Sequence, residues 1–292
     1  MGWFRVVAAG MAIAWAGASA SPAAAAQTPV NPMIDIAYVE PANPDFAPLY
    51  EGLKRRKVLE ELQAFLAPLL LPKRLTIEVA QCDAPNRLYA PGGPVTICYE
   101  YVARLRALAE KIPADGATDS GVTRDDAIIG AFVQATLQRT ASAIIDIFDL
   151  PVWGREEDAA DKLAAFLMLQ FGPDAAARLI KGAEFFFNAS EHAWNGADFA
   201  EIESPEAQRY YNYVCIAVGA DPRTFAAGGE SRDKPRSAAP GLGGVFTQYR
   251  AVKCAHEYAE ERWAFQKLLL PHVDPVLLRQ VLARDWLKPF DP

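Results

Sequence analysis

Most of the chain after residue 100 repeats apolar residues at the spacing of an α-helix, and this periodicity constrains the fold more than any other feature. An earlier segment, residues 50–71, has the same spacing, and Pro72 stops it. The chain is therefore expected to be predominantly helical. Proline and glycine divide the later part into predicted helices over residues 100–112, 124–148, 155–171, 174–190, 204–218, 244–266 and 274–284.

A short stretch between the first helix and the others has the alternation of β-strands. Leu75, Ile77 and Val79 alternate with polar residues, and a second apolar run, residues 95–99, follows a turn rich in proline and glycine. With residues 87–89 between them, these runs predict a small antiparallel sheet near the N-terminus. The expected fold class is α+β, with helix dominating.

The first 26 residues have the composition of a secretory signal peptide. A single charge, Arg5, precedes an apolar run over residues 6–16, and small residues lead up to Ala26. Cleavage after Ala20 and an uncleaved membrane anchor are the alternatives, although the run is shorter than the roughly 20 residues that a bilayer span needs. We expect an exported protein, periplasmic or secreted, with no membrane span after signal cleavage.

Composition bounds the rest of the chain. With 51% hydrophobic residues, residues 27–292 are expected to form a single domain around one sizeable core. Residues 228–244, rich in glycine, serine, proline and charge, are expected to be a mobile surface loop. The formal net charge is −7 and the richest basic cluster is the short run at residues 54–57, so we expect no nucleic-acid partner.

The chain has four cysteines, and in an exported protein these are expected to form two disulfides. Cys82 and Cys98 flank the expected hairpin, whereas Cys215 and Cys254 each lie in a helical stretch, so we pair them in that way. Four cysteines allow three connectivities, and the other two stay open. A zinc site built from all four is a further alternative, but no two of them have the Cys-x-x-Cys spacing.

One long motif, Asp-Leu-Pro-Val-Trp-Gly-Arg-Glu-Glu-Asp-Ala-Ala-Asp at residues 149–161, is highly specific. Shorter motifs accompany it at residues 97–100, 208–212, 219–222 and 250–258. Together they resemble a family of bacterial exported proteins described as putative zinc metallopeptidases, over essentially the whole chain after the signal segment. The resemblance implies a zincin-like fold of the gluzincin type, in which one helix carries His-Glu-x-x-His and a second helix presents a glutamate.

In active relatives the resemblance implies a zinc ion held by the two histidines, with the glutamate after the first histidine as general base. The second helix supplies a glutamate ligand and, one turn later, an aspartate that orients a histidine; Glu157 and Asp161 match these positions here. At residues 138–142, where the family pattern places His-Glu-x-x-His, the chain reads Gln-Arg-Thr-Ala-Ser. Both histidines and the base are therefore replaced.

The replacements are chemically poor substitutes. Amide and hydroxyl groups are weak zinc ligands beside imidazole, and the permanent charge of Arg139 would oppose the ion. We therefore expect no metal cofactor. The chain's three histidines, His192, His256 and His272, provide no second motif, and a family position that often holds histidine aligns with Glu203. The vestigial metal-site positions are Gln138, Arg139, Ser142, Glu157 and Asp161.

The sequence predicts a pseudopeptidase: a non-catalytic family member that binds an unknown peptide or protein partner or serves as a structural envelope protein. The alternative is an active metal-dependent peptidase with a non-standard site around Glu157 and Asp161, with help from Glu203. Two simpler interpretations stay open. The acidic residues of 156–161 can form a solvated first helical turn, and Arg139 can pair with Glu157 or Asp161, so that a salt bridge replaces the metal.

Overall fold

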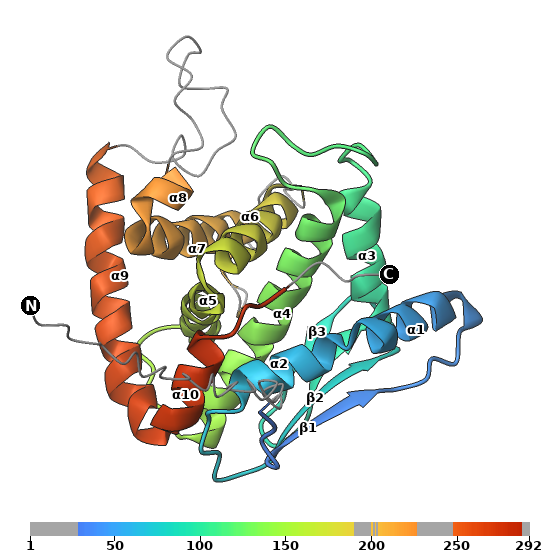
Figure 1. Cartoon of the computed structure of the whole chain (residues 1–292), viewed down its shortest axis with the longest axis horizontal. Helices are drawn as coiled ribbons and strands as arrows, with labels where there is room; N and C mark the ends of the chain where they lie inside the picture. Colours follow the sequence, from blue (N-terminus) through green and yellow to red (C-terminus); the bar gives the residue numbers. More distant parts are fainter. Residues whose placement is uncertain (1–28, 190–199, 201, 203, 227–247, 288–292) are drawn as a thin grey trace, which may run out of the picture.

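The computed structural model describes residues 29–189, 200, 202, 204–226 and 248–287 (Figure 1). The predicted signal peptide and the predicted loop over residues 228–244 lie outside these residues, as do His192 and Glu203. The described chain is mostly helical, with one small sheet near its N-terminus. The predicted dominance of helix is therefore confirmed.

The sheet is mixed, so the predicted antiparallel sheet is wrong. Strands β1, β2 and β4 run parallel to one another, and only β3 pairs antiparallel with β4. All four residues of β4 are buried, as is typical of parallel strands covered on both faces. The hairpin joins β3 to β4, whereas β2 and β4 are parallel neighbours. The strands, in the order β1-β2-β4-β3, are β1 (Ile34–Tyr38), β2 (Leu75–Ala80), β3 (Arg87–Leu88) and β4 (Val95–Cys98).

Most helices lie within a few residues of their predicted bounds. The exception is the predicted helix over residues 50–71, which is two helices separated at Lys57, whose φ of 52° interrupts the helical backbone. Short 3₁₀ turns lie at Pro44–Phe46, Leu169–Phe171 and Leu270–His272. The α-helices are α1 (Ala47–Arg56), α2 (Val58–Leu66), α3 (Tyr99–Ala109), α4 (Arg124–Ile147), α5 (Glu156–Met168), α6 (Pro173–Ala189), α7 (Glu206–Ala220), α8 (Pro222–Ala226), α9 (Gln248–Leu269) and α10 (Pro275–Leu282).

Helix α4 is the central element of the fold. Thr123 and Asp126 form a reciprocal capping box at its start. The helix packs against α3, α5 and α6, and at the α6 crossing Gly130 and Gly182 let the two backbones approach more closely than any side chain would allow. By length and composition α4 could cross a membrane, but 89% of its most apolar window is buried inside the protein. It is the core helix of this fold.

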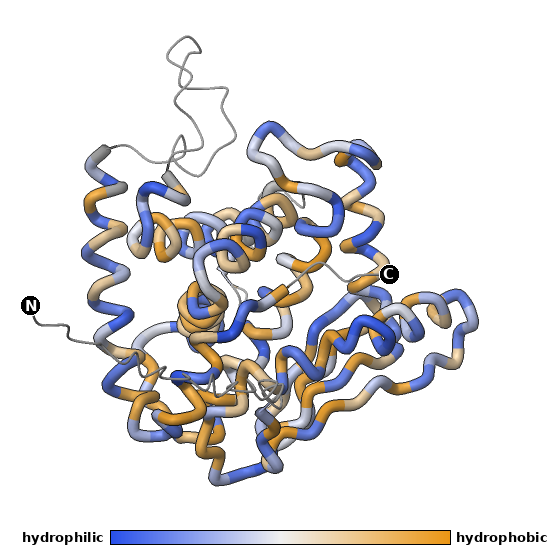
Figure 2. Tube along the Cα trace, viewed as in Figure 1, coloured by the Kyte–Doolittle hydropathy of each residue, from blue (hydrophilic) through white to orange (hydrophobic). Residues whose placement is uncertain are grey.

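A tight reversal brings α5 back alongside α4. Asp149 adopts a left-handed conformation with φ of 51°, and the Leu150 amide donates to the Ile145 carbonyl at 2.9 Å, which closes the end of α4. Pro151 then prevents further helix. Helix α5 begins with acidic residues, which the positive end of its dipole favours, and hydrophobic residues line much of its length (Figure 2).

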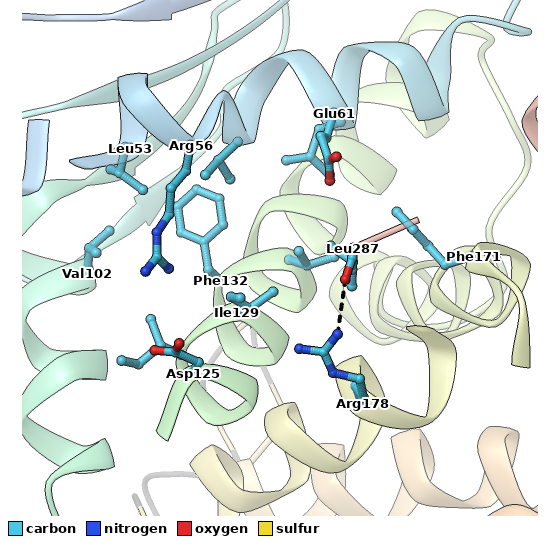
Figure 3. Close-up of a pocket in the computed structure, with 14 residues that line it drawn as sticks. Leu53, Arg56, Glu61, Val102, Asp125, Ile129, Phe132, Phe171, Arg178 and Leu287 are labelled. Atoms are coloured by element: carbon cyan, nitrogen blue, oxygen red, sulfur yellow. Dashed lines mark hydrogen bonds between the residues drawn. The ribbon is translucent and has the colours of Figure 1, made fainter. Parts of the chain in front are cut away.

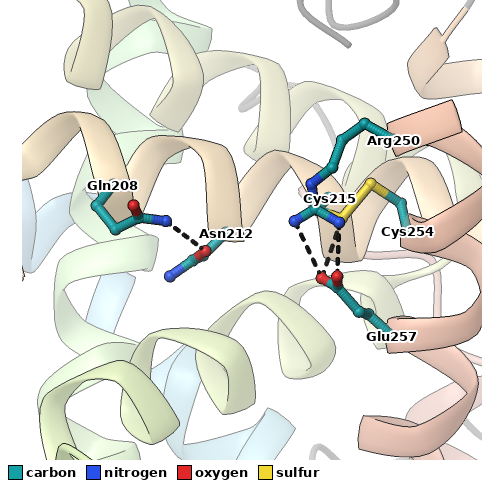
Figure 4. Close-up of a disulfide and its surroundings, with 6 residues drawn as sticks. All are labelled: Gln208, Asn212, Cys215, Arg250, Cys254 and Glu257. Atoms are coloured by element: carbon teal, nitrogen blue, oxygen red, sulfur yellow. Dashed lines mark hydrogen bonds and ion pairs between the residues drawn. A yellow bond between two sulfur atoms is a disulfide. The ribbon is translucent and has the colours of Figure 1, made fainter. Parts of the chain in front are cut away.

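The structure contains two disulfides, Cys82–Cys98 and Cys215–Cys254, which are the two pairs expected from the sequence. The first joins the segment after β2 to the end of β4. The second joins α7 to α9, beside an ion pair in which Arg250 contacts Glu257 at 2.6 Å (Figure 4). Two disulfides are typical of proteins that fold in an oxidising compartment outside the cytoplasm.

Candidate functional site

The five positions that the family resemblance assigns to a former metal site lie on α4 and α5, two helices that pack against each other. Gln138 donates from Nε2 to Glu157 Oε2 at 2.7 Å. Arg139 Nη1 lies 2.9 Å from Oε1 and 2.8 Å from Oε2 of the same carboxylate. The pairing of Arg139 with Glu157 that the sequence allowed is therefore present, and both oxygens of Glu157 accept hydrogen bonds from α4.

The α4 side of this site is buried and incompletely hydrogen-bonded. Gln138, Arg139 and Ser142 are all buried. Gln138 Oε1 and Ser142 Oγ have no hydrogen-bond partner among the described residues, and neither does Thr140 Oγ1. Buried polar atoms are nearly always satisfied in folded proteins, so this cluster is an exception that calls for an explanation.

Asp161 has a different partner. Its Oδ2 accepts from Arg209 Nε at 2.6 Å and its Oδ1 accepts from Arg209 Nη2 at 2.9 Å. Gln134, one turn before Gln138 on α4, adds a longer bond of 3.3 Å to Oδ1. Arg209 lies on α7, so Asp161 ties α5 to both α7 and α4. The sequence motif at residues 208–212 contains Arg209, but nothing in the sequence assigned it a role.

More acidic groups surround the Glu157 end. The Tyr89 hydroxyl donates to Asp146 Oδ2 at 2.8 Å, which connects the strand hairpin to the end of α4. Burial and this hydrogen bond to the carboxylate raise the pKa of Tyr89 to about 12. Burial, with the neighbouring carboxylates of Glu157 and Asp146, raises the pKa of Glu156. The nearby guanidinium of Arg139 opposes this rise, so Arg139 acts on both Glu156 and Glu157.

The two histidines in the described part of the chain, His256 and His272, make contacts with residues other than Glu157 and Asp161. His256 is exposed on α9 beside Glu260, and the ring of His272 stacks on Phe148 at 4.3 Å. Within the described residues, only Cys82, Cys98 and Glu100 bring three donors of the histidine, cysteine or carboxylate type within 4.8 Å, and these two cysteines are joined in a disulfide. Glu157 and Asp161 are in no such group.

Two features of the structure are thus on hand for comparison: a helical fold with a small mixed sheet, and a Glu-x-x-x-Asp segment at the start of α5 whose Glu157 contacts Gln138 and Arg139 of α4. The sequence matches the protein family described as "Putative metallopeptidase" over residues 38–269, and the chain belongs to this family. No curated protein and no solved structure shows significant similarity to the chain.

Proposed function

We propose that this protein is an exported, non-catalytic member of its metallopeptidase family, with a zincin-like scaffold in which an ion pair stands in place of the zinc ion. The observation that carries the proposal is the contact of Arg139 Nη1 with both carboxylate oxygens of Glu157, at 2.9 and 2.8 Å. Glu157 is the residue expected to bind zinc in active relatives. Here its lone pairs are directed at a guanidinium group.

The donor set does not fit zinc. Of the positions that would supply imidazole nitrogens, Gln138 directs its amide N–H at Glu157, and Ser142 offers only a hydroxyl. Neutral amide and hydroxyl oxygens bind zinc weakly, and a guanidinium group cannot be deprotonated to make room for a cation. The unsatisfied Gln138 Oε1 and Ser142 Oγ support the view that positions 138 and 142 once held other side chains.

The competing proposal, a metal site around Glu157 and Asp161, has less support. The two carboxylates lie one turn apart on α5, yet each is hydrogen-bonded to a different arginine from a different helix. A hard cation such as Ca²⁺ needs several oxygen ligands converging on one point. The non-catalytic protein instead keeps a rigid, disulfide-linked scaffold, which suits a binding or structural role in the envelope.

Restoring the two histidines tests the proposal. In the double variant Gln138→His, Ser142→His, imidazoles four residues apart on α4 face Glu157, so we expect zinc binding of micromolar affinity or better by isothermal titration. Adding Arg139→Glu removes the competing cation and should tighten binding further. The wild-type protein should show no stoichiometric binding.

The matched control is the same double variant carrying Glu157→Ala, which should lose the regained affinity. A second control, Gln134→His with Gln138→His, places two histidines at the same spacing one turn earlier. Because Arg209 already pairs with Asp161 there, this variant should not gain comparable zinc affinity. Zinc binding by wild type, or regained binding that ignores Glu157, would refute the proposal.

A further inference from the structure

A cavity of about 350 Å³ lies at the opposite half of α4 from the Glu157 site (Figure 3). Its apolar floor is formed by α4, with contributions from α2 and the turn after α5. Asp125 at its edge and Gln138 are separated by about 20 Å along the helix. The two sites are thus distinct. The apolar side chains that line the cavity are Leu53, Val58, Leu62, Val102, Ile128, Ile129, Phe132, Val133, Phe171 and Leu287.

Four charged side chains also line the cavity, and two of them are already engaged. Arg178 donates to Asp126 at 2.7 Å and to the Leu287 carbonyl at 3.0 Å, and Glu61 lies 3.8 Å from a guanidinium nitrogen of Arg284. These contacts hold the end of the described chain over one side of the cavity. They leave Arg56 and Asp125 as the charges available to a ligand.

Arg56 ends α1 and Asp125 lies in the first turn of α4. Figure 3 shows the guanidinium and the carboxylate facing each other across one side of the cavity. Neither forms an ion pair with another described residue, the other member of the pair included. Two opposite charges thus lie beside an apolar floor without pairing with each other.

We propose that this cavity binds a small zwitterion with an apolar side chain, of the class of a free aromatic or branched-chain amino acid. Its carboxylate would meet Arg56, its ammonium group would meet Asp125, and its side chain would lie on Ile129, Phe132 and Val133. A fatty acid could pair its carboxylate with Arg56, but it has no positive group to offset the charge of Asp125. A simple amine could pair with Asp125, but it has no negative group for Arg56. Only a zwitterion satisfies both charges.

The size of the cavity supports the same class. Ligand pockets typically measure about 300–1,000 Å³, so a cavity of about 350 Å³ is at the small end and suits one amino acid better than a long acyl chain. The inference does not depend on the proposed function, because the lining residues are separate from the Glu157 site.

Isothermal titration of the full-length protein with L-phenylalanine, L-leucine and L-tryptophan tests the inference. We expect at least one of them to bind, and Arg56→Gln and Asp125→Asn each to weaken that binding by about tenfold or more. Both residues are exposed, so neither variant should alter the fold. Arg55→Gln, which removes the neighbouring exposed charge, is the matched control and should leave binding unchanged.

Analogues of the amino acid that binds separate the two charges. Its N-acetyl derivative keeps only the carboxylate, so its weaker binding should depend on Arg56 and ignore Asp125→Asn. Its amide keeps only the ammonium group and should show the opposite dependence. The inference is overturned if none of the three amino acids binds, if binding ignores both substitutions, or if dodecanoate binds more tightly than they do.

Discussion

Glu157 and Asp161 lie one turn apart on α5, and both carboxylates contact an arginine, but the two ion pairs are built differently. The Asp161–Arg209 pair is almost fully enclosed, with both side chains 4% exposed, and it uses both carboxylate oxygens and two guanidinium nitrogens. The Glu157–Arg139 pair is 18% and 10% exposed, and the same guanidinium nitrogen contacts both oxygens.

The surroundings of the two pairs differ in the same sense. Around the Asp161–Arg209 pair, the amide of Gln134 donates a further hydrogen bond to Asp161. No side-chain polar atom of Asp161, Arg209 or Gln134 is buried without a hydrogen-bond partner. Around Glu157, Gln138 Oε1 and Ser142 Oγ are buried without partners in the described chain. The polar groups at the Asp161 end are therefore fully paired, whereas the Glu157 end leaves buried polar atoms without partners in the described chain.

The largest effect should come from breaking the enclosed pair. Arg209→Ala leaves Asp161 charged and buried, and we expect a loss of about 3–5 kcal/mol in the free energy of unfolding, measured by urea denaturation. Replacing both partners with apolar residues, Asp161→Leu with Arg209→Met, removes the stranded charge and should recover a large part of that loss. A cost below about 1 kcal/mol for Arg209→Ala would mean that the pair is not buried.

A third carboxylate on α6, Glu184, sharpens the comparison because it has no arginine partner among the described residues. The Tyr210 hydroxyl donates to it at 3.1 Å, and burial raises its pKa to about 7. Between pH 4.5 and about 7, Glu184 is ionised in the unfolded chain but still protonated in the folded one. The free energy of unfolding should therefore fall by about 3 kcal/mol as the pH rises through that window.

Glu184→Gln keeps the hydrogen bond to Tyr210 but cannot ionise, so it should remove this pH dependence and stabilise the protein at pH 7. Denaturation of both proteins across the pH range checks this. Identical slopes for wild type and variant would show that Glu184 ionises as freely in the folded chain as in the unfolded one.

A smaller effect is expected at the more open pair. Arg139→Ala leaves Glu157 with the Gln138 amide and partial access to solvent, so the expected loss is about 2 kcal/mol. The exposed Arg104 on α3 is a suitable control, and its replacement with alanine should change stability by less than about 0.5 kcal/mol. If Arg139→Ala destabilised the protein as much as Arg209→Ala, the distinction between the two ends of the motif would be wrong.

The sequence predicted the helices best where local signals are strong. Thr123 caps α4 and Pro151 follows its end, so the predicted bounds of 124–148 nearly equal Arg124–Ile147. The break at Lys57 has no such signal, because apolar periodicity continues across it. The strand Ile34–Tyr38 was missed. The turn rich in proline and glycine before residues 95–99 suggested antiparallel neighbours, but only the short strand β3 is antiparallel to β4, and β2 is parallel to it.

At the candidate site, the contact of Arg139 with Glu157 is one of the two pairings that the sequence allowed, because the family resemblance placed residues 138–142 opposite Glu157 and Asp161. The pairing of Asp161 with Arg209 was not predicted, since the two residues are separated by 48 positions and only the packing of α7 on α5 brings them together. The cavity between α1, α2 and α4 also arises from tertiary packing. Its lining residues have the spacing of ordinary core positions in the sequence.

The most direct test of the central claim, that an ion pair stands in place of the zinc ion, is the zinc content of the purified wild-type protein after equilibration with Zn²⁺ and dialysis, measured by mass spectrometry of the metal. With Glu157 held by Arg139 and no histidine at positions 138 and 142, we predict zinc far below one ion per chain. One zinc ion per chain, lost when Glu157 is replaced by alanine, would contradict the account.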